Sequence, residues 1–136
     1  MSVEIRVRGY HLDVYQHVNN GRYLEFLEEA RWEYMGRTGM GASLDAAGMA
    51  MVIVNININY RLPAVIGDLL RVTVDVTRVG NKSATLTQLV NRVDGDGSET
   101  TVVDAEVTFC VMDRATEKAL PLEGQLRDLL TTGAGE

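Results

Sequence analysis

The sequence has 136 residues, of which 46% are apolar and 24% are charged, and its formal net charge is −6. This composition is typical of one compact domain and excludes intrinsic disorder and fibrous repeats. A single cysteine excludes a disulfide framework, and the acidic balance argues against a general nucleic-acid binder. No apolar run approaches the ~20 residues of a membrane helix, and MSVEIRVRGY lacks a signal-peptide core. We therefore expect a cytoplasmic protein that does not insert into membranes.

The first part of the chain predicts a strand, a loop and a long helix. Residues 3–8 alternate apolar and charged side chains, which indicates a half-buried strand. Residues 10–20 follow neither a strand nor a helix period and form a loop rich in groups capable of chemistry. From Gly21 the period is helical, and the expected apolar stripe consists of Tyr23, Leu24, Phe26, Leu27, Ala30 and Tyr34.

Capping preferences mark the ends of this helix. Asn19 or Asn20 can cap its start, because an asparagine side chain accepts a hydrogen bond from the first free N–H groups. Gly36 and Gly39 are predicted to end it, because glycine readily takes the positive φ of a helix stop. A short helical turn capped by Ser43 is expected to follow.

The remaining sequence predicts four more strands, at residues 52–61, 69–78, 83–93 and 100–112. Turn sequences separate the later strands, among them Gly80-Asn81, a common hairpin signal. In the first of these strands the expected apolar face is Val52, Val54, Ile56, Ile58 and Tyr60, opposite Asn55, Asn57 and Asn59. A terminal helix is expected at 122–130, followed by a frayed glycine-rich tail.

The order strand, helix, then four strands predicts an α+β fold in a single domain, residues 1–136. Each strand has one apolar face, and only the long helix can cover them. We therefore expect a five-stranded antiparallel sheet wrapped around that helix. Such a sheet has free edges and a second face, so we also expect oligomerisation.

The loop before the helix contains the best candidates for chemistry. Asp13, His17, Asn19 and Asn20 converge on the helix start, where free N–H groups and a partial positive charge can polarise a carbonyl oxygen. A nearby carboxylate can attack the carbonyl carbon or activate a water molecule. The alternative is structural: Asp13 forms an Asx turn and the asparagines only cap the helix. Two histidines and one cysteine do not predict a zinc site, and no cofactor is expected.

Two segments resemble a known enzyme family. HLDVYQHVNNGRYLEFLEEAR, residues 11–31, resembles the signature of hotdog-fold acyl-CoA thioesterases of the 4-hydroxybenzoyl-CoA thioesterase branch, and NYRLPAVIGDLL, residues 59–70, resembles their strand–turn–strand segment. The likeness is strongest to the long-chain acyl-CoA thioesterase type, in which VRGYHLDVYQHVNN and VNININYR recur almost unchanged. The resemblance implies a hotdog fold and hydrolysis of long-chain fatty acyl-CoA to fatty acid and coenzyme A.

The resemblance also implies roles for individual residues. Asp13 matches the catalytic carboxylate, and the N–H near Asn20 matches the group that polarises the thioester carbonyl. His17 matches a histidine of the related motif in plant acyl-ACP thioesterases, whereas Tyr15 replaces the assisting asparagine of that motif. His17 therefore either orients Asp13 or water, or simply packs. Tyr15 and Asn19 are expected beside the substrate.

Further substrate contacts are expected outside the loop. Arg61, Lys82 and Ser83 are candidates for binding the phosphates of coenzyme A. An apolar tube for the acyl chain is expected between helix and sheet, with Phe26, Val54 and Ile56 either lining it or packing in the core. Glu28 and Arg31 are predicted to form an ion pair on the helix.

Two other functions fit the same sequence, and the protein is expected to be oligomeric. An acyl-ACP thioesterase would need a basic patch for its acidic carrier protein, and a non-catalytic acyl-binding domain would have no use for Asp13. Two subunits are expected to pair edge to edge as a homodimer that shares each active site, and two dimers to form a homotetramer.

Overall fold

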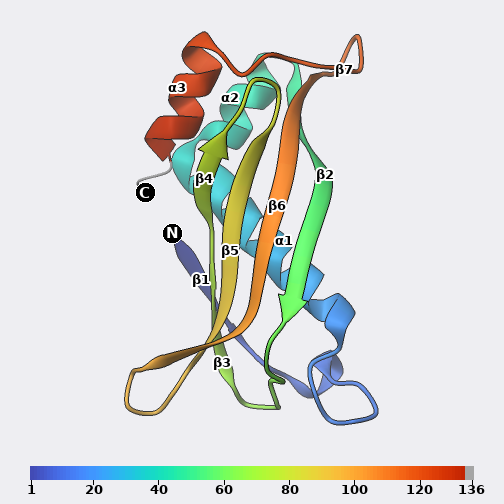
Figure 1. Cartoon of the computed structure of the whole chain (residues 1–136), viewed down its shortest axis with the longest axis vertical. Helices are drawn as coiled ribbons and strands as arrows, with labels where there is room; N and C mark the ends of the chain where they lie inside the picture. Colours follow the sequence, from blue (N-terminus) through green and yellow to red (C-terminus); the bar gives the residue numbers. More distant parts are fainter. Residues whose placement is uncertain (134–136) are drawn as a thin grey trace.

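In the computed structural model, which describes residues 1–133, a curved antiparallel sheet wraps along one long helix, α1 (Asn20–Thr38) (Figure 1). The expected α+β class and the expected helix-in-sheet arrangement are confirmed. The strands are β1 (Ser2–Arg6), β2 (Met49–Tyr60), β3 (Leu69–Thr73), β4 (Asp75–Val79), β5 (Ala84–Val93), β6 (Glu99–Asp113) and β7 (Lys118–Ala119). The smaller helices are η1 (Gly9–His11), α2 (Met40–Ala46) and α3 (Gly124–Gly133).

The sheet has the order β1-β3-β5-β6-β2, and every pairing is antiparallel. The five predicted strands lie in this path, but the sheet has seven strands: the strand expected at 69–78 is divided into β3 and β4, and the unpredicted β7 pairs with β6. At the division, side chains take part in the hydrogen bonding of Thr73. The Leu89 N–H donates to Thr73 Oγ1 at 2.9 Å, and the Gln88 side chain donates through Nε2 to the Thr73 carbonyl at 3.2 Å. These two bonds replace a step of the backbone ladder. β1 and β2 are the two ends of the path, and α1 connects them diagonally across the sheet (Figure 1).

The core lies between α1 and the inner face of the sheet. The predicted helix stripe is confirmed except at Leu24, which is 41% exposed. The buried stripe consists of Tyr23, Phe26, Leu27, Ala30 and Tyr34. The inner face of β6 is buried as predicted, at Val103, Ala105, Val107, Phe109 and Val111. Burial of this continuous apolar surface is the main contribution to the stability of the fold.

A β-bulge in β2 changes which of its residues face the core. Ile53 pairs with Phe109 and Asn55 pairs with Thr108, so Val54 is an extra residue without a partner. Before the bulge Met51 and Ile53 pack against the core, and after it Ile56 and Ile58 do. The prediction that Val52 and Val54 share the inner face was therefore wrong, and Val54 is 57% exposed. The expected polar face of Asn55, Asn57 and Asn59 is exposed.

The end of α1 also differs from the prediction. Gly36 lies inside the helix, whereas Gly39 ends it with φ 73°. Gly39 also precedes α2, so Ser43 is an internal residue of that helix and does not cap it. Met40 and Leu44, one helical turn apart, are buried and hold α2 against the core. The terminal helix begins at Gly124, two residues later than predicted, and the expectation for the tail falls on 134–136, outside the described residues.

None of the helices within residues 1–133 has the length and apolar character needed to cross a membrane.

Candidate active site

The loop before α1 folds as a tight turn around the Asp13 carboxylate. Oδ1 of Asp13 accepts hydrogen bonds from the N–H groups of Tyr15 at 2.8 Å and His17 at 3.4 Å. The backbone closes the same turn, because the Asp13 N–H donates to the His17 carbonyl at 2.9 Å. Oδ2 makes no hydrogen bond to any residue between 1 and 133. The carboxylate thus has one oxygen that holds the loop and one without a hydrogen-bond partner among residues 1–133.

The start of α1 offers an unpaired N–H group. Asn19 is the cap, and its Oδ1 accepts from the Gly21 N–H at 2.8 Å, so Asn20 is the first helical residue. The Asn20 carbonyl accepts from the Tyr60 hydroxyl at 3.2 Å, but the Asn20 N–H has no acceptor in the described part of the chain. A free N–H at a helix N-terminus, where the helix dipole is positive, is suited to bind an oxyanion or a carbonyl oxygen.

One pocket brings these groups together. It has a volume of about 230 Å³ and lies between the loop, the start of α1 and the end of β2. Four of the predicted site residues line it, namely Asp13, His17, Asn20 and Arg61. The other lining residues are Val18, Tyr23, Tyr60, Leu62 and Pro63. His17 is exposed in this pocket, and it contacts Asp13 through its backbone N–H.

Arg61 supplies a fixed positive charge at the same pocket. Its Nε donates to Asp104 Oδ2 at 2.6 Å, and Asn59 Nδ2 donates to Asp104 Oδ1 at 3.0 Å. The hydrogen bond from Arg61, assisted by the one from Asn59, lowers the pKa of Asp104, and the carboxylate in turn raises the pKa of Arg61. The two Nη groups of Arg61 make no hydrogen bond within residues 1–133, so they are available to an anionic ligand.

A buried histidine fixes the other side of the loop. The Arg8 N–H donates to Nδ1 of His11 at 2.9 Å, and the ring packs edge-on against Phe26 with centroids 5.0 Å apart. Burial, followed by the nearby Arg22 guanidinium, lowers the pKa of His11. Because Nδ1 accepts the hydrogen bond from Arg8, this contact requires the neutral imidazole, and the lowered pKa favours the same form. The His11 carbonyl accepts from the Asn19 N–H at 2.9 Å, which connects the histidine to the helix cap.

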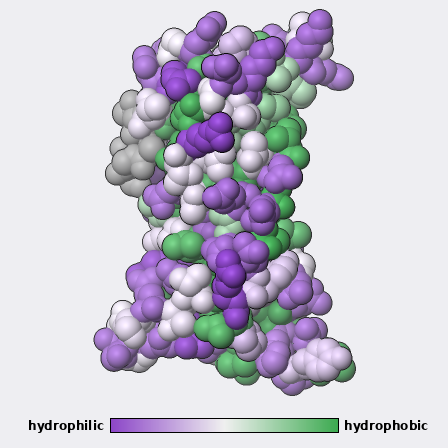
Figure 2. All heavy atoms as spheres, in the orientation of Figure 1, coloured by the Kyte–Doolittle hydropathy of each residue, from purple (hydrophilic) through white to green (hydrophobic). Residues whose placement is uncertain are grey.

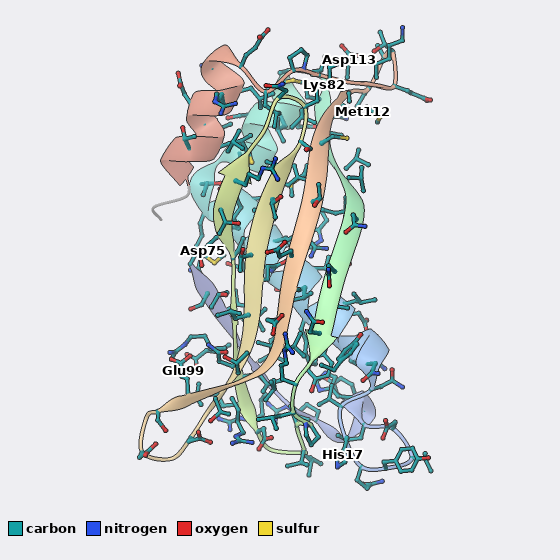
Figure 3. The ribbon with its side chains drawn as sticks, viewed as in Figure 1. His17, Asp75, Lys82, Glu99, Met112 and Asp113 are labelled. Atoms are coloured by element: carbon teal, nitrogen blue, oxygen red, sulfur yellow. The ribbon has the colours of Figure 1, made fainter. Side chains whose placement is uncertain are left out.

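Other predicted residues lie away from the pocket. Tyr15 is 77% exposed, and Asn19 is occupied as the helix cap. Lys82 lies at the opposite end of the sheet from His17, and Ser83 is its neighbour in the chain (Figure 3). A single chain therefore does not place Lys82 and Ser83 beside Asp13.

The predicted ion pair between Glu28 and Arg31 was wrong. Arg31 Nη1 donates to Gln88 Oε1 at 3.0 Å, and Glu28 Oε1 accepts from the Trp32 indole at 3.3 Å. The two side chains face different neighbours, because Arg31 reaches toward β5 while Glu28 remains on the surface of the helix.

The sequence reasoning missed Tyr60, Tyr23 and Asp104 as members of the site. Tyr60 directly precedes Arg61 in the segment that resembles the family, and that position was a signal for it. Tyr23 was assigned to the core, and burial raises the pKa of its hydroxyl to about 12, which keeps it protonated. No sequence motif marked Asp104 as part of the site, because only the register of β2 and β6 places it opposite Asn59.

Comparisons with known proteins bear on the family and the fold of the chain. The model of the thioesterase-like superfamily matches residues 7–130. Long-chain acyl-CoA thioesterase FadM of Escherichia coli strain K12 is 51% identical over 130 residues, which is 96% of each chain. The solved structure of YbaW, a probable thioesterase from Escherichia coli, aligns with a TM-score of 0.91 at 49% identity, over 98% of each chain. A 4-hydroxybenzoyl-CoA thioesterase mutant solved with 4-hydroxybenzoyl-CoA aligns with a TM-score of 0.85 at 18% identity, over 96% of this chain and 97% of that one. The predicted hotdog fold is confirmed.

Proposed function

The chain belongs to the thioesterase-like superfamily, and from this membership we propose that it hydrolyses long-chain fatty acyl-CoA to the free fatty acid and coenzyme A. One observation carries the proposal: the free Oδ2 of Asp13 and the unpaired N–H of Asn20 belong to residues that line a single pocket. The name of the Escherichia coli relative, with 51% identity along nearly the whole chain, supports a long acyl chain.

In the proposed reaction the thioester carbonyl oxygen accepts a hydrogen bond from the Asn20 N–H, and the positive end of the α1 dipole stabilises its developing charge. Asp13 Oδ2 then acts in one of two ways. It attacks the carbonyl carbon to form a mixed anhydride that water hydrolyses, or it takes a proton from a water molecule that attacks. In both cases the carbon–sulfur bond breaks, and coenzyme A leaves as a thiolate that needs no strong general acid.

The other pocket residues have supporting roles in this proposal. His17 is exposed beside the pocket and is positioned to orient the attacking water. Arg61 has free Nη groups for a phosphate of coenzyme A. Tyr15 lies on the exposed side of the loop, where the pantetheine of the substrate would pass. Lys82 and Ser83 would contact coenzyme A only from a second subunit, because they lie at the far end of the sheet.

We further propose a homodimer, paired through β2, with two dimers forming a tetramer. β2 is an end strand of the sheet, and an end strand presents unpaired N–H and carbonyl groups to a second copy. Its Val54 is exposed on this side of the molecule, which also favours coverage by a partner. The proposed setting is the fatty acid metabolism of the cytoplasm, where acyl-CoA is formed and consumed.

The decisive test measures thiol release from palmitoyl-CoA by the wild-type protein and by Asp13→Asn. Asparagine retains an Oδ1 acceptor for the loop but removes the charge, so we expect the fold to persist and kcat to fall at least about 100-fold. Turnover of palmitoyl-ACP but not palmitoyl-CoA would favour the carrier-protein alternative. Binding of both without turnover by the wild type would favour a non-catalytic acyl-binding domain. Full activity of Asp13→Asn would leave a thioesterase whose mechanism is not the proposed one.

A further inference from the structure

A second pocket lies further along α1, away from Asp13. It has a volume of about 320 Å³ and is bounded by the second half of α1, by α2 and by the first half of β2. Most of its walls are apolar, and the apolar contributors are Trp32, Met35, Leu44, Met49, Met51 and Ile53. The residues that the sequence suggested for an acyl tube, Phe26, Val54 and Ile56, do not line it. Nothing in the proposed reaction uses this pocket.

Both pockets open on the same side of α1, the side that faces β2. Asn20 lies at the first pocket and Trp32 at the second, and Leu24 lies between them on the same helical stripe. Along this seam β2 runs opposite to α1: Tyr60 contacts Asn20, whereas Met49 shares the pocket of Met35. Figure 2 shows hydrophobic side chains along the β2 margin of the sheet, beside a face that is mainly hydrophilic.

Several large hydrophobic side chains are exposed along the seam. Among the described residues, large hydrophobic side chains are exposed in the end loops and along this seam. On α1 the exposed ones are Leu24 and Trp32, and Trp32 is 69% exposed. Isolated exposed hydrophobic residues need no explanation, and the exposed Glu28 lies between Leu24 and Trp32 on α1. It is the two pockets at the ends of the seam that indicate a binding groove.

The length of the seam matches a long acyl chain. An α-helix rises about 1.5 Å per residue, so Trp32 and Met35 lie roughly 18 and 22 Å beyond Asn20. An extended carbon chain advances about 1.3 Å per C–C bond, so 16 carbons span roughly 19 Å. With its carbonyl at the Asn20 N–H, a palmitoyl chain along the seam would therefore end beside Trp32 and Met35.

α2 borders the second pocket. Gly41 lies there, and a Cβ at this position would be 3.5 Å from the Met35 Cβ, in ordinary contact. Asp45 and Arg114, which also line the pocket, form an ion pair that connects α2 to the residue following β6. The same Cβ at Gly41 would lie 3.6 Å from the Met35 carbonyl oxygen, also in ordinary contact. Because Gly41 lines the pocket, we expect a larger side chain at this position to take up part of its space.

The charged groups of this pocket are engaged elsewhere. Arg31 is half-buried and donates to Gln88 Oε1, and Gln88 Nε2 donates to the Leu27 carbonyl at 3.1 Å. Glu28 accepts from the Trp32 indole, which fixes the ring at the rim. The interior surface left to a ligand is therefore the apolar part of the lining.

We propose that the acyl chain lies along the α1–β2 seam and that the pocket bordered by Gly41 sets the longest chain that the enzyme accepts. This inference rests on the proposed thioesterase function. Gly41 and Met35 are then specificity-determining residues, and a second subunit would cover the chain without filling the pocket.

The first test replaces Gly41 by leucine and measures kcat/KM for acyl-CoA from hexanoyl to palmitoyl. We expect kcat/KM for palmitoyl-CoA to fall at least about 10-fold, while the value for hexanoyl-CoA changes less than about twofold. Gly36→Leu is the matched control, because Gly36 lies near the end of α1 with no atom within 4 Å of an added Cβ. Its chain-length profile should remain that of the wild type.

The second test uses Trp32, the single tryptophan of the chain, as a probe of the pocket. Palmitoyl-CoA brominated at its terminal carbon is bound to the Asp13→Asn protein, and bromine quenches a nearby indole. We expect strong quenching by this ligand and little by palmitoyl-CoA brominated next to the carbonyl. Prior saturation with unlabelled palmitoyl-CoA should remove the quenching.

The outcomes separate the two proposals. A wild-type enzyme that hydrolyses palmitoyl-CoA, together with an unchanged profile in Gly41→Leu or equal quenching by both brominated ligands, would overturn the chain-length inference alone. A change of sedimentation coefficient in Gly41→Leu without a shifted profile would also overturn it, because the pocket would then belong to the subunit interface. Absence of turnover by the wild type at every chain length would instead overturn the proposed function, even if terminal bromine still quenched Trp32.

Discussion

The two pockets along α1 are built from different parts of the same helix. The pocket at its start uses backbone groups and a carboxylate: the Asn20 N–H and Asp13 Oδ2 are both unpaired among residues 1–133. The pocket near its end is walled mainly by apolar side chains, because interior N–H and carbonyl groups of a helix are paired with one another. The difference teaches that one helix can provide reactivity at its N-terminus and contact area along its flank. If so, changes at one pocket should alter the rate at every chain length, and changes at the other should alter selectivity.

The largest effect is expected at Asp13, where two substitutions divide its two roles. Asp13→Asn and Asp13→Ala should both lower kcat by about 10²–10⁴ at every acyl chain length, since both remove the carboxylate. Only Asp13→Ala should also lower the free energy of unfolding, by about 1 kcal/mol, because the N–H groups of Tyr15 and His17 then lose their acceptor. Thiol release and urea unfolding measure the two quantities. A chain-length dependence of the loss in kcat would contradict the separation of the pockets.

The next largest effect is expected at Gln88, which is fully buried and accepts a hydrogen bond from Arg31, a lining residue of the apolar pocket. Gln88→Leu removes the acceptor of Arg31 and the donor to the Leu27 and Thr73 carbonyls, so we expect a loss of about 2–3 kcal/mol in unfolding free energy. Thr85→Val on the same strand, whose side chain points away from the core, is the control and should cost less than about 0.5 kcal/mol. Hexanoyl-CoA turnover should remain; its loss would show that the two pockets are not independent.

A smaller effect is expected at Arg61. Arg61→Gln should raise KM for acyl-CoA by about 3- to 10-fold and weaken the dependence of KM on salt, because a positive charge near the phosphates is removed. The variant frees Asp104, whose pKa should then rise. Arg37→Gln, which removes a surface charge paired with Glu33 at the other end of α1, is the control. An equal change in KM for the two variants would mean that Arg61 acts only through net charge.

The smallest effect concerns pH. Burial lowers the pKa of His11 in the folded protein below the ordinary value near 6.5, so the unfolded chain binds a proton more readily. The stabilising contribution of neutral His11 is therefore complete above about pH 6.5 and is lost as the pH falls from there toward the folded pKa. Urea unfolding at about pH 7.5 and 5.5 should show a decrease in stability that is smaller in His11→Gln. His17→Gln controls for the loss of a histidine from the loop, and an identical pH dependence in wild type and His11→Gln would refute the assignment.

The fold was predictable where the spacing of apolar side chains is regular and the strand pairing is not interrupted by a bulge. The alternation of β6 and the stripe of α1 were read correctly because burial of a whole face follows from the period alone. The inner face of β2 was predicted incorrectly before residue 55. The extra residue Val54 exchanges the inner and outer faces of the strand, and the alternation of residue types does not reveal such a bulge. The same applies to α2, where Gly39 at once ends one helix and precedes the next.

For the site, local sequence placed Asp13, His17 and Asn20 together, because all three lie within eight residues of one turn and one helix start. It also made Arg61 a candidate for binding the coenzyme A phosphates, since an arginine beside the turn can bind phosphate. Local sequence did not predict the hydrogen-bond partners of Arg61 and Arg31. Asp104 and Gln88 are more than 40 residues away from them in the chain, and only the pairing of strands and the packing of α1 bring them near.

Sequence by itself thus determined the class of fold, the family and the loop on which the proposed reaction depends, since each follows from residue types at short separations. Tertiary structure alone decided which oxygen of Asp13 is free, that Lys82 lies far from it, and that an apolar pocket continues the line of α1. These are properties of hydrogen-bond partners and distances between segments remote in the chain. They depend on how the sheet closes around the helix, which no local pattern specifies.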